Sequence, residues 1–282
     1  MLVENTLFGV RDKVKTSIER LQAFEPPEGY YLAFSGGKDS QCIYHLAKEA
    51  GVKFDAHYNK TTVDPPELVH FIRDYYPDVI VDRPPKTMWQ LVEKKGLPLR
   101  TKRWCCEVLK EHGGEDRICV TGVRWAESSR RKNTRGIAEV IGKQEAQVML
   151  LNDNEEDRQM FENCQLKGKR VINPIIDWTD EDVWEYIRSR NIEYCKLYDE
   201  GFKRLGCIGC PMANMNRIHA FERYPKFKQA YIRAISRFLP SYIERKKAKG
   251  KEPQFTTAEE MFDWWIYGKK EEGTLDGQID IF

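Results

Sequence analysis

The sequence predicts an α/β fold in which a parallel sheet carries helices on both faces. Short apolar runs alternate with segments of helical periodicity along most of the 282 residues, and strands that alternate with helices form parallel sheets. A polar glycine loop, SGGKDS at 35–40, lies between the first apolar run and a helical segment. Ligands bind at the carboxyl ends of strands in such sheets, so this loop is the first candidate site.

The expected strands are short apolar runs bounded by polar or turn-forming residues. They cover residues 30–34, 54–59, 78–84, 118–124 and 171–176. Helices are expected at 40–50, 66–76, 87–95, 105–112 and 180–190. Thr179 is the expected N-cap of the last helix, because Asp182 follows three residues later and completes a capping pattern.

Three regions are expected along the chain. Residues 1–27 are interpreted as an amphipathic N-terminal helix, residues 28–215 as the main domain, and residues 216–282 as a C-terminal helical appendage. Pro225 and Pro240 are expected to interrupt the helices of the appendage.

Composition excludes few partners. Lys and Arg number 46 against 44 Asp and Glu, so the net charge of +2 neither favours nor excludes a polyanion. The basic run at 244–251 is interpreted as a solvated helix end rather than a nucleic-acid contact. No apolar run reaches 18 residues and no signal-peptide pattern occurs, so a cytoplasmic protein without membrane contact is expected.

The SGGKDS loop has the composition of an anion site. Gly36 and Gly37 let a ligand approach the backbone, and N–H groups at the start of a helix attract phosphate. The loop is not a Walker motif, because its glycines are adjacent and Lys38 is followed by Asp39. These residues alone leave open a plain turn in which Ser35 or Asp39 only caps the helix.

Cysteines occur at ligand spacing in two places. Cys105 and Cys106 are adjacent, and Cys207 and Cys210 form a CxxC. Four thiolates match a [4Fe–4S] cluster or a tetrahedral zinc ion. The adjacent pair favours the larger cluster, because neighbouring side chains cannot easily point at one small ion; zinc and unligated thiols are the alternatives. The remaining cysteines are expected to be small buried side chains: Cys42, Cys119, Cys164 and Cys195.

A segment rich in arginine and serine follows the fourth expected strand. Residues 121–136 include Arg124, Ser128 and Arg131. Guanidinium groups bind phosphate or sulfate oxygens in pairs, so the segment suits a nucleotide or an oxyanion. A solvated loop is the alternative.

Together these motifs resemble the phosphoadenosine phosphosulfate reductase family. The resemblance rests on SGGKDS, the adjacent cysteines, TGVRWAESSRR from Thr121, INPIIDWTDEDVWEYI from Ile172 and GCIGCPM from Gly206. It covers about residues 28–215 and implies the adenine-nucleotide α-hydrolase-like fold of the PP-loop ATP pyrophosphatase superfamily. The cysteine pattern is similar to the [4Fe–4S] ligand set of adenylylsulfate-reducing members and of related phosphorothioation proteins.

The resemblance implies a role for each matching residue. The loop would cradle a pyrophosphate of ATP, with Lys38 stabilising the leaving group and Asp39 binding Mg²⁺. The implied catalytic residues are Lys38, Asp39 and Arg124. The implied nucleotide-binding residues are Ser35, Gly36, Gly37, Asp39, Ser40, Arg124, Ser128 and Arg131. The implied cluster ligands are Cys105, Cys106, Cys207 and Cys210.

Two features favour ATP chemistry over reduction. Sulfonucleotide reductases of the family use a cysteine in a C-terminal tail, whereas residues 211–282 contain none. The loop also keeps the full SGGxDS of members that cleave ATP between the α and β phosphates. The favoured hypothesis is an enzyme that adenylylates an acceptor and releases pyrophosphate, in sulfur transfer or nucleic-acid modification. Its expected partners are an adenine nucleotide, a sulfur donor protein and a nucleic-acid substrate.

Two other functions are open. One is an adenylylsulfate or phosphoadenylylsulfate reductase whose nucleophile comes from a partner or from a cysteine such as Cys195. The other is a non-catalytic iron–sulfur module that senses redox state or binds nucleic acid.

Overall fold

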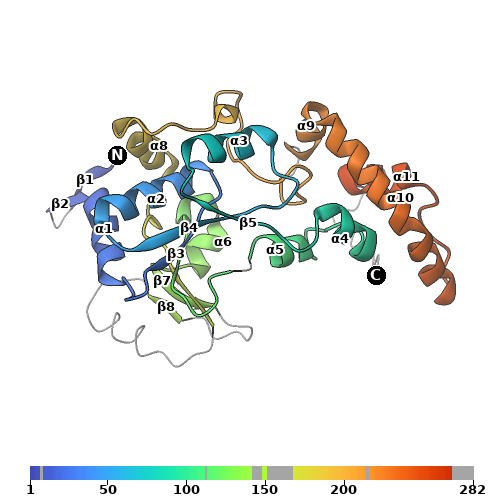
Figure 1. Cartoon of the computed structure of the whole chain (residues 1–282), viewed down its shortest axis with the longest axis horizontal. Coiled ribbons are helices and arrows are strands. Elements are labelled where there is room, and N and C mark those ends of the chain that lie inside the picture. Colours follow the sequence, from blue (N-terminus) through green and yellow to red (C-terminus); the bar gives the residue numbers. More distant parts are fainter. Residues whose placement is uncertain (7–8, 112, 142–147, 151–167, 214–215, 269–282) are drawn as a thin grey trace. The chain divides into compact units, whose positions relative to one another are not determined.

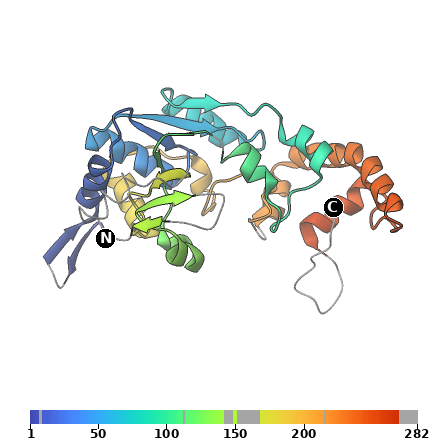
Figure 2. The same ribbon diagram turned by 90° about the horizontal axis from the view of Figure 1, so that it is seen from below.

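The computed structural model describes residues 1–6, 9–111, 113–141, 148–150, 168–213 and 216–268. The chain packs as two compact units, which Figures 1 and 2 show in sequence colours. Unit 1 comprises residues 1–59, 66–82 and 112–205, and unit 2 comprises residues 60–65, 83–111 and 206–282. The boundary expected at 215 does not follow these units, because two segments that precede it pack with the C-terminal helices.

A mainly parallel sheet flanked by helices forms the centre of unit 1 (Figure 1). Its strands are β3 (Tyr30–Ala33), β4 (Phe54–Asn59), β5 (Ile80–Asp82), β6 (Cys119–Val120), β7 (Ala138–Ile141), β8 (Val148–Leu150) and β9 (Lys169–Ile172). In the order β5-β4-β3-β6-β9-β7-β8, the first five strands are parallel, and β7 is antiparallel to both of its neighbours. The predicted α/β fold is confirmed, with an antiparallel edge that was not predicted.

The helical elements of unit 1 cover and join these strands. They are α1 (Lys13–Ala23), α2 (Lys38–Ala50), α3 (Pro66–Tyr75), α6 (Ser129–Thr134), α8 (Asp180–Ser189) and the 3₁₀ turns η1 (Trp125–Glu127) and η2 (Lys196–Tyr198). The predicted cap of α8 is confirmed, since Thr179 Oγ1 accepts from the N–H of Asp182 and the carboxylate of Asp182 accepts from the N–H of Thr179. Leu32, Ile43 and Trp178 lie fully buried in the core between sheet and helices.

The N-terminal region differs from the expected helix over residues 1–27. An antiparallel hairpin, β1 (Val3–Thr6) and β2 (Gly9–Asp12), precedes α1. The helix begins only at Lys13, because the carboxylate of Asp12 accepts hydrogen bonds from the N–H groups of Val14 and Lys15 and so caps its first turn.

Unit 2 is helical. Its helices are α4 (Met88–Lys95), α5 (Trp104–Leu109), α9 (Asn216–Arg223), α10 (Pro225–Ala248) and α11 (Ala258–Tyr267). Helices α4 and α11 pack against α10, and a Cβ at Gly96 after α4 would lie 2.8 Å from the ring of Phe238 in α10. This close packing places residues 83–111 in the same unit as the C-terminal helices.

Pro240 lies inside α10 and does not end it, contrary to the sequence-based expectation. Pro225 instead occupies the start of the helix, where the missing N–H costs nothing. Pro240 and Ser236, whose carbonyl loses its N–H partner, are both exposed, so water can bond to that carbonyl. Among the helices described, none is both long and apolar enough to cross a membrane.

Candidate functional site

The SGGKDS loop joins the carboxyl end of β3 to the first turn of α2. Gly36 has a φ of 72°, and a Cβ there would lie 2.7 Å from the side chain of Ile72 and 2.8 Å from that of Leu68. Conformation and packing therefore both require glycine. Gly37 is the N-cap of α2 and offers no side chain to cap it. The loop thus presents the positive end of a helix, in which the first N–H groups lack intrahelical partners.

Hydroxyl groups tie the loop to the helix. Ser40 Oγ donates to the carbonyl of Gly37 at 2.8 Å, and Ser35 Oγ accepts from the N–H of Gly37 at 3.4 Å. Tyr198 of η2 accepts a hydrogen bond from the N–H of Lys38 at 2.9 Å. Sequence analysis did not identify Tyr198, because a single tyrosine in a loop carries no motif.

Four charged side chains at the SGGKDS loop are joined by ion pairs and hydrogen bonds. Lys38 Nζ lies 2.8 Å from Asp180 Oδ1 and 3.6 Å from Asp39 Oδ2. Arg124 Nε donates to Asp39 Oδ1, and its Nη2 donates to Asp180 Oδ1, both at 2.7 Å. Burial alone would raise the pKa of Asp180, but hydrogen bonds from Lys38 and Arg124 outweigh it and lower that pKa. The two cations and two carboxylates balance one another.

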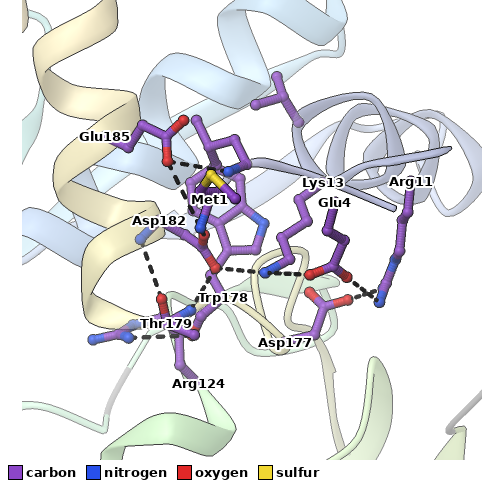
Figure 3. A network of polar contacts seen from close by, with 12 residues as sticks. Met1, Glu4, Arg11, Lys13, Arg124, Asp177, Trp178, Thr179, Asp182 and Glu185 are labelled. Carbon is purple, nitrogen blue, oxygen red and sulfur yellow. Dashed lines mark hydrogen bonds and ion pairs between the residues drawn. The ribbon is translucent and has the colours of Figure 1, made fainter. Parts of the chain in front are cut away.

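The structure brings together the candidate catalytic residues Lys38, Asp39 and Arg124, but their side chains differ in exposure. The side chain of Arg124 is 1% exposed, and its Nη1 donates to the carbonyl of Trp178 at 3.2 Å (Figure 3). Lys38 is also buried, whereas the side chain of Asp39 is 24% exposed. Asp39 is therefore the accessible member of the trio, and Arg124 fixes its position.

A second polar network holds the start of α8, which carries Asp180. Figure 3 shows Lys13 of α1 beside Asp182, with Nζ and Oδ2 2.7 Å apart. Burial would raise the pKa of Asp182, but hydrogen bonds from Lys13 and its other partners outweigh it and lower the pKa to about 2. Arg11 also pairs with Asp177 at the turn before α8 (Figure 3). These pairs attach the start of α8 to the N-terminal elements.

Gly122, just after β6, was not identified from the sequence. A Cβ there would lie 3.0 Å from the carbonyl carbon and oxygen of Asp39, so a larger residue would press on the SGGKDS loop. Asp180 was also missed. Gly122 lies in the motif TGVR, where the available signal was a glycine two residues before an arginine. Asp180 lies in the motif DWTD, where the available signal was an acidic residue at the start of a helix.

Positive charge gathers in the arginine segment. Ser128 caps α6 by accepting from the N–H of Arg131 at 3.2 Å. Burial, followed by repulsion from Arg204 and Arg135, lowers the pKa of Arg131 to about 10. Arg131 also pairs with Glu127, and burial is the largest cause of its lowered pKa. An anion placed here would relieve that repulsion.

The four candidate ligand cysteines lie in unit 2 and line one cavity of about 30 Å³. Cys105 and Cys106 come from the first turn of α5, and Cys207 and Cys210 come from the turn before α9. Gly209 between the latter two has a φ of 79°, and a Cβ there would lie 2.8 Å from the ring of Phe221. The fold thus brings together thiols that are about a hundred residues apart.

The donor set fits a four-cysteine cluster in its chemistry, since all four thiols face one cavity. The cluster is not confirmed: within the described ranges, no group of three or more His, Cys, Asp or Glu side chains is arranged to hold a metal ion. Three of the other cysteines, Cys42, Cys119 and Cys195, are buried as predicted. Cys164 lies outside the described residues.

Comparison with known proteins identifies the family. A family model described as the phosphoadenosine phosphosulfate reductase domain matches residues 29–213. The chain belongs to this family. The match confirms the predicted family but does not show the cysteine pattern to be a ligand set.

Relatives of this phosphoadenosine phosphosulfate reductase family member include enzymes and a protein of unknown function. This chain is 26% identical over 210 residues to an uncharacterised protein of Methanocaldococcus jannaschii. The match covers 73% of this chain and 47% of the relative. The chain spans about half the length of the two curated relatives from that organism, 47% and 42%. It is 26% identical over 221 residues to adenosine 5'-phosphosulfate reductase of Staphylococcus epidermidis, covering 71% of this chain and 79% of that enzyme.

One solved structure that the family member resembles is phosphoadenylyl-sulfate reductase of Candida auris in complex with phosphate. The TM-score is 0.47 at 17% identity, over 68% of this chain and 88% of that chain.

Proposed function

We propose that this chain binds Mg-ATP at the SGGKDS loop, transfers AMP to an acceptor and releases pyrophosphate. The observation that carries the proposal is the N-terminus of α2, opened by Gly36 and Gly37, with the partly exposed carboxylate of Asp39 fixed beside it. The N–H groups of Gly37 and Lys38 bond to the hydroxyls of Ser35 and Tyr198, which a phosphate oxygen would replace. Backbone N–H groups at such a terminus suit a phosphate group, and a carboxylate next to it suits the Mg²⁺ that accompanies ATP.

The proposed catalysis is electrostatic. Loop N–H groups would stabilise the charge that develops on the leaving pyrophosphate, since fixed dipoles require no reorganisation during the reaction. Arg124 would act as a positioning residue, because its buried guanidinium holds Asp39 on one side and Asp180 on the other. Asp39 would hold Mg²⁺ against the phosphates.

Lys38 has a conditional role in this proposal. Its Nζ contacts Asp180 at 2.8 Å, and in this proposal it exchanges that carboxylate for a phosphate oxygen of the pyrophosphate. The side chain of Asp180 is 63% exposed, so water can take the place of the lost partner. Such an exchange would couple nucleotide binding to a change of partners at the start of α8.

The arginine segment would receive the remaining negative charge of the nucleotide. Arg131 and Ser128 are proposed for this contact, since Arg204 and Arg135 add positive charge around Arg131. Ser128 would keep its cap of α6 while doing so, because a hydroxyl can accept one hydrogen bond and donate another.

The cysteine cavity is proposed to hold a [4Fe–4S] cluster through Cys105, Cys106, Cys207 and Cys210, with zinc as the alternative. When bound, such a cluster would position the acceptor or handle sulfur from a donor protein. The chain itself would supply the four thiols and the glycine turn at Gly209 that keeps the last two on one cavity.

A reductase is the second candidate function, favoured by the adenosine 5'-phosphosulfate reductase relative of S. epidermidis. Reduction needs an accessible thiolate. Cys195 does not supply one, because it is 1% exposed and burial raises the pKa of its thiol. Residues 211–282 contain no cysteine either. A reductase would therefore take its thiol from a partner or from a cysteine of this chain other than Cys195.

Product analysis with ATP labelled in the α-phosphate tests the proposal. Mg²⁺-dependent release of pyrophosphate is expected, with the label on the acceptor or, where water takes the acceptor's place, in free AMP. Asp39→Asn should slow the reaction about a hundredfold. Asp263→Asn, which removes an exposed carboxylate of α11 in unit 2, is the matched control. Formation of ADP and phosphate, or release of AMP that is indifferent to Asp39→Asn, would contradict the proposal.

A further inference from the structure

Charge is distributed unevenly between the two units. The segments of unit 2 contain 22 Lys and Arg against 14 Asp and Glu, a net charge of +8. The segments of unit 1 contain the other 24 Lys and Arg and the other 30 Asp and Glu, a net charge of −6. The whole-chain value of +2 hides this asymmetry, which is typical of chains with one part that meets a polyanion.

Helix α10 concentrates this positive charge. Its 24 residues include seven cations and one anion, Glu244. The cations are Lys226, Lys228, Arg233, Arg237, Arg245, Lys246 and Lys247. A helix of this length extends about 36 Å. Figure 1 shows it as the long orange helix.

One face of α10 is occupied by packing. Its buried residues are Tyr231, Ala234, Ile235, Phe238, Leu239 and Tyr242. Three of the cations lie over aromatic rings of unit 2, so they also contribute to packing. The pairs are Lys228 with Phe262, Arg245 with Phe238, and Lys246 with Tyr242.

The opposite face carries a basic stripe of Lys226, Arg233 and Lys247, all exposed. Their spacings of 7 and 14 residues place them on one line along the helix. The line is about 32 Å long. Arg237 lies on the same face but pairs with Glu93 of α4 at 2.5 Å.

We propose that this stripe binds the phosphodiester backbone of a nucleic acid. Its length is close to one turn of a duplex, about 34 Å, and lysine and arginine on one helix face are the usual electrostatic contacts to phosphate. The stripe includes Lys247 of the basic run at 244–251, which the sequence indicated as a solvated helix end, and adds two cations earlier in the helix. It also identifies the acceptor class of the adenylylation as a nucleic acid, a step that rests on the proposed function.

Fluorescence anisotropy of the full chain with a labelled 20-base-pair DNA duplex and an RNA hairpin, over a series of KCl concentrations, tests the binding. The logarithm of the affinity should fall linearly with the logarithm of salt. Combining Lys226→Gln, Arg233→Gln and Lys247→Gln should make the slope shallower by about three units, one for each phosphate contact. Glu244→Gln, which removes the acid on the same face, should tighten binding.

The matched control combines Lys15→Gln, Lys53→Gln and Lys196→Gln, three exposed lysines of unit 1 that give the same change in net charge. An equal slope change in both triple variants would overturn the proposal, because it would reflect net charge alone. Binding to phosphatidylserine vesicles with no binding to either nucleic acid would also overturn it. The DNA and RNA arms identify which backbone is preferred. ATP cleavage by the same variants is a separate readout, so failure of the proposed function is distinguishable from failure of this surface.

Discussion

Arg124 joins two carboxylates through one buried guanidinium, and its bond to Asp180, 2.7 Å from Nη2 to Oδ1, connects the segment after β6 to the start of α8. Its Nε bonds equally closely to Asp39 on α2. One side chain thus fixes the relation between the proposed phosphate loop and the helix that carries Asp180. Arginine suits this position because its planar donors serve several acceptors at once.

Replacing Arg124 should therefore destabilise unit 1. Arg124→Ala should lower the free energy of unfolding by about 3 kcal/mol, because it leaves two carboxylates without their shared partner. Arg124→Lys should recover part of this loss, since an ammonium keeps the charge but cannot span all three acceptors. Urea unfolding of the variants measures both. Equal stability of Arg124→Ala and wild type would contradict the assignment.

Three glycine-to-alanine substitutions separate the stability cost of backbone conformation from the stability cost of side-chain packing. Gly51→Ala should cost about 1 kcal/mol, because its φ is 70° but no atom lies within 4 Å of the added Cβ. Gly36→Ala should cost about 1–3 kcal/mol more, since the Cβ also meets Ile72 and Leu68. Gly37→Ala should barely change stability, because its φ is −80° and its nearest neighbour would be Tyr198 at 3.4 Å.

The same glycine series predicts binding. Gly37→Ala places a methyl group at the mouth of the loop, so it should weaken ATP binding while the protein stays folded. Thermal unfolding and nucleotide titration on the same samples check this. An unchanged ATP affinity in Gly37→Ala would argue against the loop as the phosphate site.

Acid should weaken the attachment of α8 to α1. The pKa of Asp182 is lowered to about 2 in the folded state from an ordinary value of 3.8, because burial, which raises it, is outweighed by the combined hydrogen bonds from Lys13 and its other partners. A carboxyl with a depressed pKa stabilises the fold above its unfolded pKa, and this contribution is lost as pH falls from about 4 to 2. The shift corresponds to about 2 kcal/mol.

Urea unfolding between pH 2 and 6 measures this dependence. Asp182→Asn should flatten the pH profile between about pH 4 and 2, whereas the exposed Asp263→Asn should leave it unchanged. A profile that is equally steep in wild type and Asp182→Asn would show that other carboxyls control acid stability.

The cysteine cavity predicts iron content. Protein prepared without oxygen should carry about four iron atoms and four sulfides per chain. Cys207→Ser should abolish or strongly reduce this content, whereas Cys42→Ser, buried in unit 1, should retain it. Stoichiometric zinc without iron would instead favour the zinc alternative, and equal metal content in both variants would exclude this cavity as the site.

The sequence predicted the elements that depend on local patterns. The strands at β3 and β4 were found from apolar runs, and the cap at Thr179 from its spacing to Asp182, because both signals are contained in a few residues. The hairpin before α1 was missed, since its polar strands lack a clear alternation. Pro240 was read as a helix break because exposure of the freed carbonyl is not visible in sequence.

The site could be predicted only in part, because motifs identify residues but not their partners. Lys38, Asp39 and Arg124 were named from their motifs, but their pairing through Asp180 depends on how β6 and α8 meet α2 in the fold. Tyr198 accepts a hydrogen bond from the N–H of Lys38, although the two residues are 160 positions apart in the sequence. The composition of unit 2 was likewise unpredictable, since residues 83–111 join the C-terminal helices by packing of side chains such as Phe238.

Calorimetric titration of the full chain, prepared without oxygen, with Mg-ATP, adenylylsulfate and phosphoadenylylsulfate tests the central claim most directly. The account predicts Mg²⁺-dependent binding of ATP that is tighter than binding of either sulfonucleotide and is weakened in Gly37→Ala. Tighter binding of a sulfonucleotide, independent of Mg²⁺, would contradict the adenylylating enzyme and favour a reductase.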